Sequence, residues 1–204
     1  MKLTDGLLAC GLAFPAVYFA NLFGVPLLDP AFDHARQAPS DLGAQGAPYA
    51  ALFNAGLGLS AFMAFLGAIG LVLGLRRLGA GLYVSVMTGL SLALLAFALA
   101  MSAAFPLPDP LHYGFNLYFA GLLTPLFGAI ALGPVRGAAG ARLIALLGMM
   151  ASFALIVMTI GPFGLADASN QGLWIRALAF VSFFTIGYLC FAVLRGFDKG
   201  RETG

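Results

Sequence analysis

Six long apolar stretches, separated by short polar segments, make up most of this chain. An α-helix needs about 20 apolar residues to cross a hydrocarbon core of about 30 Å, and each stretch is that long. The predicted spans are residues 7–28, 48–75, 78–105, 111–135, 143–165 and 173–194. The pattern therefore predicts an all-α polytopic membrane protein, a single domain of residues 1–204 built as a bundle of six transmembrane helices with short loops.

The composition supports this class of protein. Of 204 residues, 61% are hydrophobic and only 9% are charged, a balance far outside that of soluble domains. The net charge of +2 is small and dispersed, so it gives no reason to expect nucleic acid as a partner. Lys2 precedes the first apolar stretch, but no Ala-x-Ala site follows that stretch, so we expect an uncleaved first helix.

Charged residues are segregated between alternate gaps. Short loops rich in Lys and Arg stay in the cytoplasm, so the gaps with the basic residues are assigned to that side. Six spans then place both termini in the cytoplasm, and the protein is expected in a bacterial cytoplasmic (inner) membrane. The basic side holds Lys2, Arg76, Arg77, Arg136, Arg142, Arg195, Lys199 and Arg201, and the outer side holds Asp29, Asp33, Asp41, Asp109, Asp167 and both histidines.

The middle of every predicted span lacks Lys, Arg, Asp, Glu and His. Charged groups in hydrocarbon usually mark an ion path or a proton relay, so their absence argues against a proton-coupled transporter and a voltage sensor. A retinal protein would need a lysine inside the membrane, and a b-type cytochrome would need histidines there. Hydroxyl side chains within the spans, such as Tyr18 and Ser182, are expected to bond helix carbonyls or to bridge helices.

Glycines recur along the predicted helices, and five of them lie in span 48–75. A residue without a Cβ atom lets two helix backbones approach closely, which is a main source of helix association in lipid. We therefore interpret these glycines as packing positions. Pro15 and Pro125 lie inside the first and fourth spans and are expected to kink them.

A faint internal repeat relates the second and fourth spans. Phe53-Asn54 and Phe115-Asn116 stand 62 residues apart, and Arg176 lies at a similar depth in the sixth span. Because an amide facing acyl chains is costly unless bonded, we expect at least Asn116 and Arg176 to point into the bundle. With Asn54 they would form a polar pocket open to the outside, roofed by loop 29–47, whose own composition predicts little fixed structure.

The segment between the third and fourth spans contains the densest polar signal. Asp109 followed by Pro110 is typical of a helix N-cap, so a helix is expected to start there. Asp109, His112 and Asn116 would then follow one another along one face of an α-helix. Helix capping alone explains Asp109. The alternative is that Asp109, His112 and Asn116 form a polar strip that binds a ligand.

Metal binding has weaker support. Asp29, Asp33 and His34 are the candidate ligands, but spacing alone does not show that they converge, and no two-histidine helical motif is present. We predict no metal and no cofactor, and the apolar helices are compatible with a bound lipid.

The chain resembles a bacterial family of six-helix membrane proteins, "domain of unknown function 998". The resemblance rests on the six spans, the long first outer loop and Phe105-Pro106-x-x-Asp109 before a helix that opens with His112. Members often open the last helix with Gly-x-x-Glu-Arg. Here Gly172 and Arg176 are kept but Ile175 replaces the acid, so no acid–base role is carried over. The family has no established activity, so the resemblance implies the fold.

Three functions are compatible with these observations. The favoured hypothesis is a non-catalytic membrane protein that binds a lipid, a pigment or another membrane protein, as an accessory subunit or with a second copy of itself. The second is a membrane enzyme or receptor-like protein with an outer-face site at His112 and Asp109. The third is a small transporter of an uncharged or amphipathic solute. The ligand-binding candidates are Asp109, His112, Asn116, Arg176 and Asn54.

Overall fold

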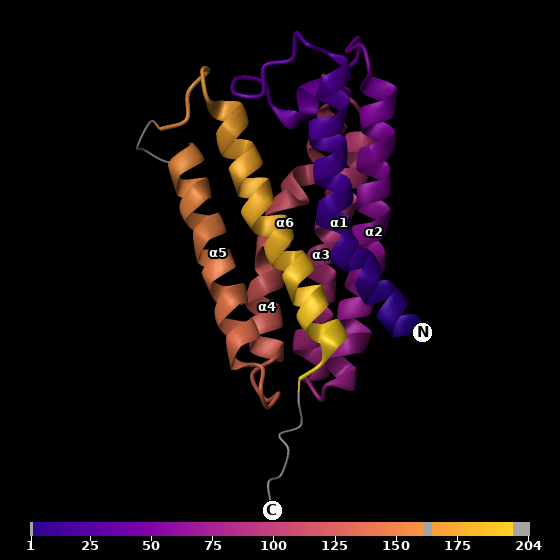
Figure 1. Cartoon of the computed structure of the whole chain (residues 1–204), viewed down its shortest axis with the longest axis vertical. Coiled ribbons are helices and arrows are strands. Elements are labelled where there is room, and N and C mark those ends of the chain that lie inside the picture. The colour runs from indigo at the N-terminus through magenta and orange to yellow at the C-terminus, as the bar shows by residue number, and fades with distance from the viewer. Residues whose placement is uncertain (1, 161–164, 198–204) are drawn as a thin grey trace, which may run out of the picture.

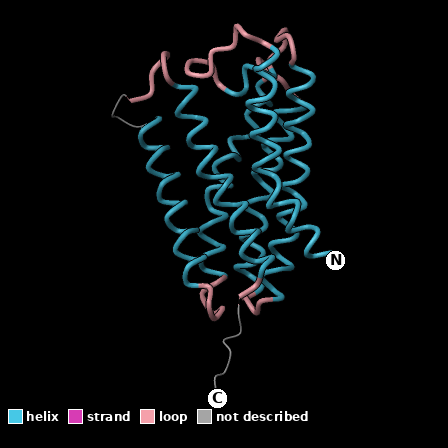
Figure 2. Tube along the Cα trace, in the orientation of Figure 1, coloured by secondary structure: helices cyan, strands magenta, loops and turns pink. Residues whose placement is uncertain are grey.

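A computed structural model describes residues 2–160 and 165–197, and within these ranges the regular structure is helical (Figures 1 and 2). The α-helices are α1 (Leu3–Gly24), α2 (Ala50–Arg77), α3 (Leu82–Ala104), α4 (Thr124–Ala131), α5 (Ala139–Ile160) and α6 (Gln171–Arg195). Three 3-10 helices, η1 (Val25–Leu28), η2 (Pro39–Gly43) and η3 (Pro110–Leu123), complete the set. Six helical segments are long and apolar enough to cross a membrane, with η1 extending α1 and η3 preceding α4. The predicted all-α membrane fold is confirmed.

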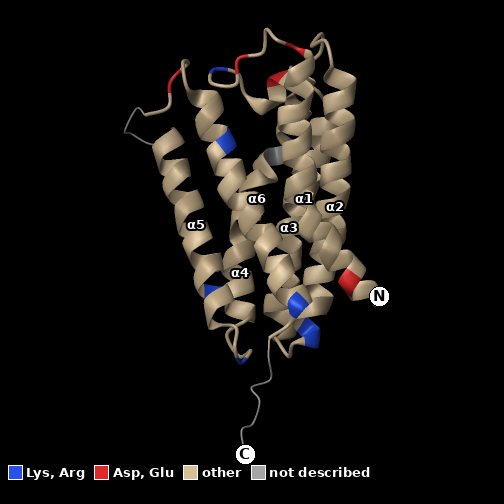
Figure 3. Cartoon of the chain, viewed as in Figure 1, with Lys and Arg blue, Asp and Glu red and all other residues tan. Residues whose placement is uncertain are grey.

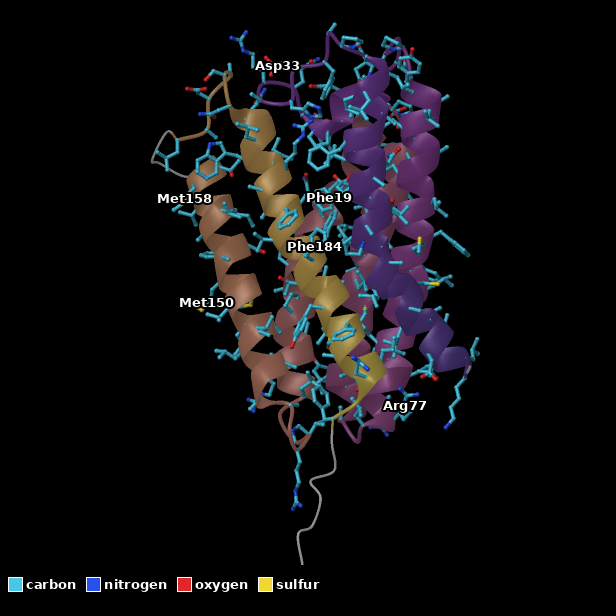
Figure 4. All side chains as sticks on the ribbon, in the orientation of Figure 1. Phe19, Asp33, Arg77, Met150, Met158 and Phe184 are labelled. Carbon is cyan, nitrogen blue, oxygen red and sulfur yellow. The ribbon has the colours of Figure 1, made fainter. Side chains whose placement is uncertain are left out.

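The helices form one bundle in which α6 is central. It crosses the bundle obliquely and packs against α1 on one side and α5 on the other (Figure 1). Helix α5 lies at the edge, and most of its residues are not covered by the rest of the chain. Met150 and Met158 of α5 point away from the bundle (Figure 4).

Most acidic residues lie at one end of the bundle and most basic residues at the other, as the sequence predicts (Figure 3). The exceptions are Asp5, which pairs with Arg77, and Arg36 and Arg176, which lie in or against loop 29–47. We call the end with Asp29, Asp33, Asp41, Asp109 and Asp167 the acidic end, and the end with Arg76, Arg77, Arg136, Arg142 and Arg195 the basic end. Asp33 and Arg77 mark the two ends in Figure 4. Helix α1 starts at the basic end and α6 finishes there, in agreement with six crossings (Figure 1).

Glycines bring α1 and α2 into backbone contact. A Cβ atom added to Gly67 would lie 2.5 Å from the Cα of Gly11, and one added to Gly70 would lie 2.8 Å from the carbonyl carbon of Leu7. Only residues without side chains permit this approach. The interpretation of these glycines as packing positions is confirmed.

Aromatic rings fill the space between α1 and α6 near the acidic end. Phe19 stacks on Phe184 with ring centroids 5.5 Å apart (Figure 4), and Tyr18 meets the edge of Phe183 at 4.8 Å. Such pairs add to the stabilisation that burial alone provides. They fix how α6 lies against the first helix and so position the residues of the site.

The fourth span departs from the predicted continuous α-helix. It runs as a 3-10 helix through η3 and becomes α-helical only at Thr124. Pro125 lies in the first turn of α4, where its missing N–H costs nothing, so it begins a helix and does not kink one. Pro15, in contrast, lies inside α1 as predicted.

Candidate functional site

Arg176 is the most buried charged side chain among the described residues, at 5% exposure. Its Nη1 donates hydrogen bonds to the carbonyl oxygens of His34 (2.9 Å), Gln37 (2.8 Å) and Gly172 (2.9 Å). The first two carbonyls belong to loop 29–47, so this side chain connects α6 to the loop between the first two spans. The prediction that Arg176 points into the bundle is confirmed.

Gly172 adds to the connection from one turn earlier in α6. Its N–H donates to the carbonyl of Ala35 (2.8 Å), and a Cβ atom at this position would collide with three loop carbonyls. The two residues kept from the pattern Gly-x-x-Glu-Arg are therefore the two that bind the loop. Ile175, which stands where the acid would be, lines a cavity described below.

The two asparagines differ from one another. Asn54 is half-buried and donates from Nδ2 to the carbonyl of Gly43 in the same loop (2.9 Å). Asn116 is exposed and has a φ of +59°, so the prediction that it points into the bundle is wrong. A residue in this left-handed conformation cannot continue an α-helix, and the Phe-Asn repeat does not reveal the change.

Asp109 and His112 also do not form the predicted strip with Asn116. The Asp109 side chain accepts from the backbone N–H of Leu111 (2.8 Å), so the capping interpretation is confirmed. His112 is buried and its Nδ1 lies 3.0 Å from the carbonyl oxygen of Phe105. The strip assumed α-helical spacing, whereas η3 has about three residues per turn.

The three metal candidates lie in loop 29–47 with separate contacts. Asp29 and Asp33 accept from backbone N–H groups of Ala31 and Ala35, respectively. Burial lowers the pKa of His34, Arg176 lowers it further, and Asp33 opposes them. Within the described ranges no group of three or more His, Cys, Asp or Glu side chains is placed to hold a metal ion.

A cavity of about 280 Å³ lies in the half of the bundle toward the acidic end. Loop residues 38–40 cover it, and η3, α6, α1 and α3 supply its walls. Most of its lining is apolar, and six polar side chains contribute to it: Tyr18, Ser40, His112, Tyr113, Tyr118 and Ser182. Phe119 and Tyr113 are about half exposed and also line it, so the cavity opens beside η3. A pocket beneath loop 29–47 was expected, but Asn54, Asn116 and Arg176 are not among its lining residues.

Hydrogen bonds engage three of these six side chains. Tyr118 bonds the Ser102 hydroxyl, Ser182 donates to Ser152 (2.9 Å), and His112 contacts the Phe105 carbonyl. The Tyr18 hydroxyl has no hydrogen bond to any other residue of the described part. Sequence reasoning placed Tyr18 and Ser182 among general helix contacts, because hydroxyl residues are too common in apolar spans to be singled out.

A second cavity of about 180 Å³ is lined mainly by residues of the same loop. Asp29, Asp41, Gln37 and Tyr49 contribute its polar groups. Asp41 also accepts from the N–H of Ala38 (2.8 Å), so part of this carboxylate is committed to holding the loop turn η2.

Comparisons with known proteins place the chain in a family. The model of the family described as "Protein of unknown function (DUF998)" matches residues 8–193, from the first span to the last. Searches of curated proteins and of solved structures found no match. The matched region includes Phe105-Pro106, Asp109, His112, Gly172 and Arg176, the residues on which the resemblance rests. The chain therefore belongs to the DUF998 family of membrane proteins.

Proposed function

We propose that this protein is a non-catalytic membrane protein that binds an amphipathic molecule, a lipid in particular, in the cavity lined by Tyr18 and Phe119. The cavity carries the proposal: its volume is near the lower end of the roughly 300–1,000 Å³ of ligand sites, and its lining combines apolar walls with a few polar groups. Tyr18 offers a hydroxyl that no described residue binds, which suits a ligand with one hydrogen-bonding group and an apolar body.

The lateral opening supports a ligand that comes from the membrane. Tyr113 and Phe119 line the cavity and expose about half of their surface, and they belong to a membrane-spanning segment. An apolar chain can therefore pass between lipid and cavity without crossing water. We further propose a bacterial inner membrane as the location, with the basic end in the cytoplasm, on the ground of the charge segregation.

The test compares two substitutions of the same kind. Ala179→Phe fills the cavity, because Ala179 lines it, whereas Ala55→Phe adds the same ring to an exposed position of α2. The full-length protein, purified in mild detergent, would be examined by native mass spectrometry for retained lipid. We expect the wild type and Ala55→Phe to retain an amphipathic molecule and Ala179→Phe to lose it. If the wild type retains none, or Ala179→Phe retains as much, the proposal is wrong.

Two other functions predict different results. An enzyme or receptor with a site at His112 and Asp109 would lose its activity in His112→Gln and Asp109→Asn, although both side chains are engaged with separate backbone groups. A transporter would move a solute across vesicles that contain the purified protein, with Ala179→Phe blocking the transport. A partner membrane protein would remain bound through purification.

A further inference from the structure

Arg176 uses only part of its hydrogen-bonding capacity. Its Nη1 makes the three bonds to carbonyl oxygens described above. Its Nε and Nη2 are buried, and neither has a hydrogen-bond partner in the described part of the chain. A guanidinium remains charged in proteins, so burial leaves a cation with one half bonded and the other half free.

The free half is the edge of the guanidinium that recognises oxyanions. The N–H groups of Nε and Nη2 are coplanar and nearly parallel, which matches two oxygens of one carboxylate or phosphate group. Carbonyl oxygens already occupy the other terminal nitrogen. The geometry therefore leaves available the edge that binds an anion with two hydrogen bonds.

No carboxylate among the residues that the structure describes pairs with this edge. The ion pairs within the described ranges are Arg36–Asp33 and Arg77–Asp5, and neither includes Arg176. The Asp33 oxygens hold the backbone of the loop turn and the Arg36 side chain. Asp33 and Asp41 are near enough to interact electrostatically with Arg176, but neither forms an ion pair with it. Because a buried cation that is not directly paired with an anion is unfavourable, an external anion at Nε and Nη2 would stabilise this arrangement.

A second buried polar group, an imidazole, lies in the loop that Arg176 contacts, and its Nδ1 can donate a hydrogen bond when it carries the proton. His34, whose own carbonyl accepts from Arg176, has a buried Nδ1 that also lacks a partner in the described part. Its ring is 5.3 Å from that of Phe32, and the Phe32 ring in turn lies 5.6 Å from the Arg176 Cζ. Phe32, His34 and Arg176 thus form one cluster between loop 29–47 and α6.

We propose that this cluster binds an oxyanion, the phosphate or carboxylate of a lipid head group or of a free anion, through Nε and Nη2 of Arg176 and Nδ1 of His34. Arg176 is five residues from the first residue of α6, about 7.5 Å along the helix axis, which is near the head-group level. The two nitrogens are buried and the Phe32 ring lies beside the guanidinium, so binding moves Phe32 outward while α6 stays in place. The site is separate from the cavity proposed to hold the apolar ligand.

The test uses the full-length protein in lipid nanodiscs. Three conditions are compared: phosphatidylcholine alone, phosphatidylcholine with phosphatidylglycerol, and phosphatidylcholine with inorganic phosphate in the buffer. The measured quantity is the Tm, followed by the fluorescence of the single tryptophan, Trp174, which precedes Arg176 by two residues. We expect phosphatidylglycerol to raise the Tm if the anion is a head group, and phosphate to raise it if the anion is free.

Five variants make the test specific. Arg176→Gln and Arg176→Lys are expected to abolish the rise in Tm, because neither has the paired N–H edge. Arg36→Gln removes an exposed arginine from the same loop and is expected to keep it. His34→Gln leaves the bonds from Nη1 to the carbonyls in place and is expected to reduce the rise, which keeps the test valid if the Arg176 variants do not fold. The cavity variant Ala179→Phe is expected to respond as the wild type does.

Three results would overturn the proposal. The first is a wild type that responds to neither phosphatidylglycerol nor phosphate. The second is an Arg176→Lys variant that responds as the wild type does, because then charge alone is sufficient. The third is an equal loss in Arg36→Gln, which would assign the effect to general surface charge. Each of these results is independent of whether lipid is retained in the cavity.

Discussion

At the scale of single residues, the close crossing of α1 and α2 depends on glycine. Gly11 and Gly67 meet backbone to backbone, and no side-chain rearrangement can relieve a collision between two main chains. The same helix α2 also contains Gly58, whose added Cβ would have ordinary contact, 3.9 Å from the Cβ of Ala103. Substitutions at Gly67 and Gly58 can therefore separate the packing role of glycine from its effect on helix propensity.

We expect Gly67→Ala to lower the free energy of unfolding by about 1–3 kcal/mol, the usual effect of overpacking a well-packed contact. Gly58→Ala is expected to be neutral or to stabilise by up to about 1 kcal/mol, because alanine favours helix. Thermal unfolding of both variants in the same detergent measures the difference. Equal Tm values for the two would show that the α1–α2 contact is not close.

His34 gives the outer loop a dependence on pH. Burial and Arg176 lower the pKa of His34 below its ordinary value of 6.5, so the folded loop binds a proton less readily than the unfolded chain does. The contribution of neutral His34 to the free energy of unfolding is therefore fully present above about pH 6.5. It is lost as the pH decreases through that value toward the pKa of His34 in the folded protein.

The lowered pKa of His34 predicts how the Tm changes with pH. The Tm of the wild type is expected to fall between about pH 7 and about pH 5, and His34→Gln is expected to weaken that fall, because glutamine does not titrate. The Tm of both proteins would be measured across this range at constant salt. An identical fall in His34→Gln would assign the pH dependence to other groups.

At the scale of elements, apolar length predicted the spans and local chemistry predicted the Asp109 cap, because both depend on residues close in the sequence. The 3-10 course of η3 was not predictable in this way. The carbonyl oxygen of His112, which an α-helix would pair with the N–H of residue 116, accepts from the Ser102 hydroxyl of α3. This contact comes from another helix, so no pattern within the fourth span reveals it.

The connection between loop 29–47 and α6 is another element that local patterns do not show. The hydrogen bonds from Arg176 to the loop span long separations in the chain: 142 positions to His34 and 139 positions to Gln37. The sequence signal was the pair Gly172 and Arg176 of the family pattern, but a shared pattern does not say what the residues contact. A pocket beneath the loop was expected, but most of the residues that line the cavity were missed for the same reason, since its walls come from several helices and a loop.

A substitution at Gly172 tests the connection. We expect Gly172→Ala to displace loop residues 34–37, whose carbonyls lie where the new methyl group would be. The rate of hydrogen–deuterium exchange in this loop should then increase by about 10-fold for each hydrogen bond that is lost. This factor corresponds to about 1.4 kcal/mol of local stability.

A matched control exists in α5. Gly140 is the second residue of its helix, as Gly172 is of α6, and a Cβ atom there would meet nothing within 4 Å. Gly140→Ala should therefore leave the exchange in loop 29–47 unchanged. Unchanged exchange in Gly172→Ala would mean that the loop is not held by α6.

At the scale of the whole molecule, the separation of charge between the two ends predicts an orientation in the membrane. We expect the acidic end to face outward. On a chain with Cys10→Ala and Cys190→Ala, a membrane-impermeant maleimide should label Gln45→Cys in intact cells and label Pro134→Cys only after permeabilisation. Both positions are exposed, one at each end of the bundle. The reverse pattern of labelling would reverse the proposed topology.

The bonds between Arg176 and loop 29–47 also bear on how the protein is made. The loop leaves the ribosome after the first helix, but its anchor on α6 is synthesised about 140 residues later. Until α6 inserts, the loop has no anchor. The aromatic face of α1 also lacks its packing partner until then, since Phe14, Tyr18 and Phe19 pack against rings of α6. The last helix therefore completes the fold. A chain truncated before α6 would have an incomplete bundle and an unanchored loop, which the quality-control machinery of the membrane could recognise.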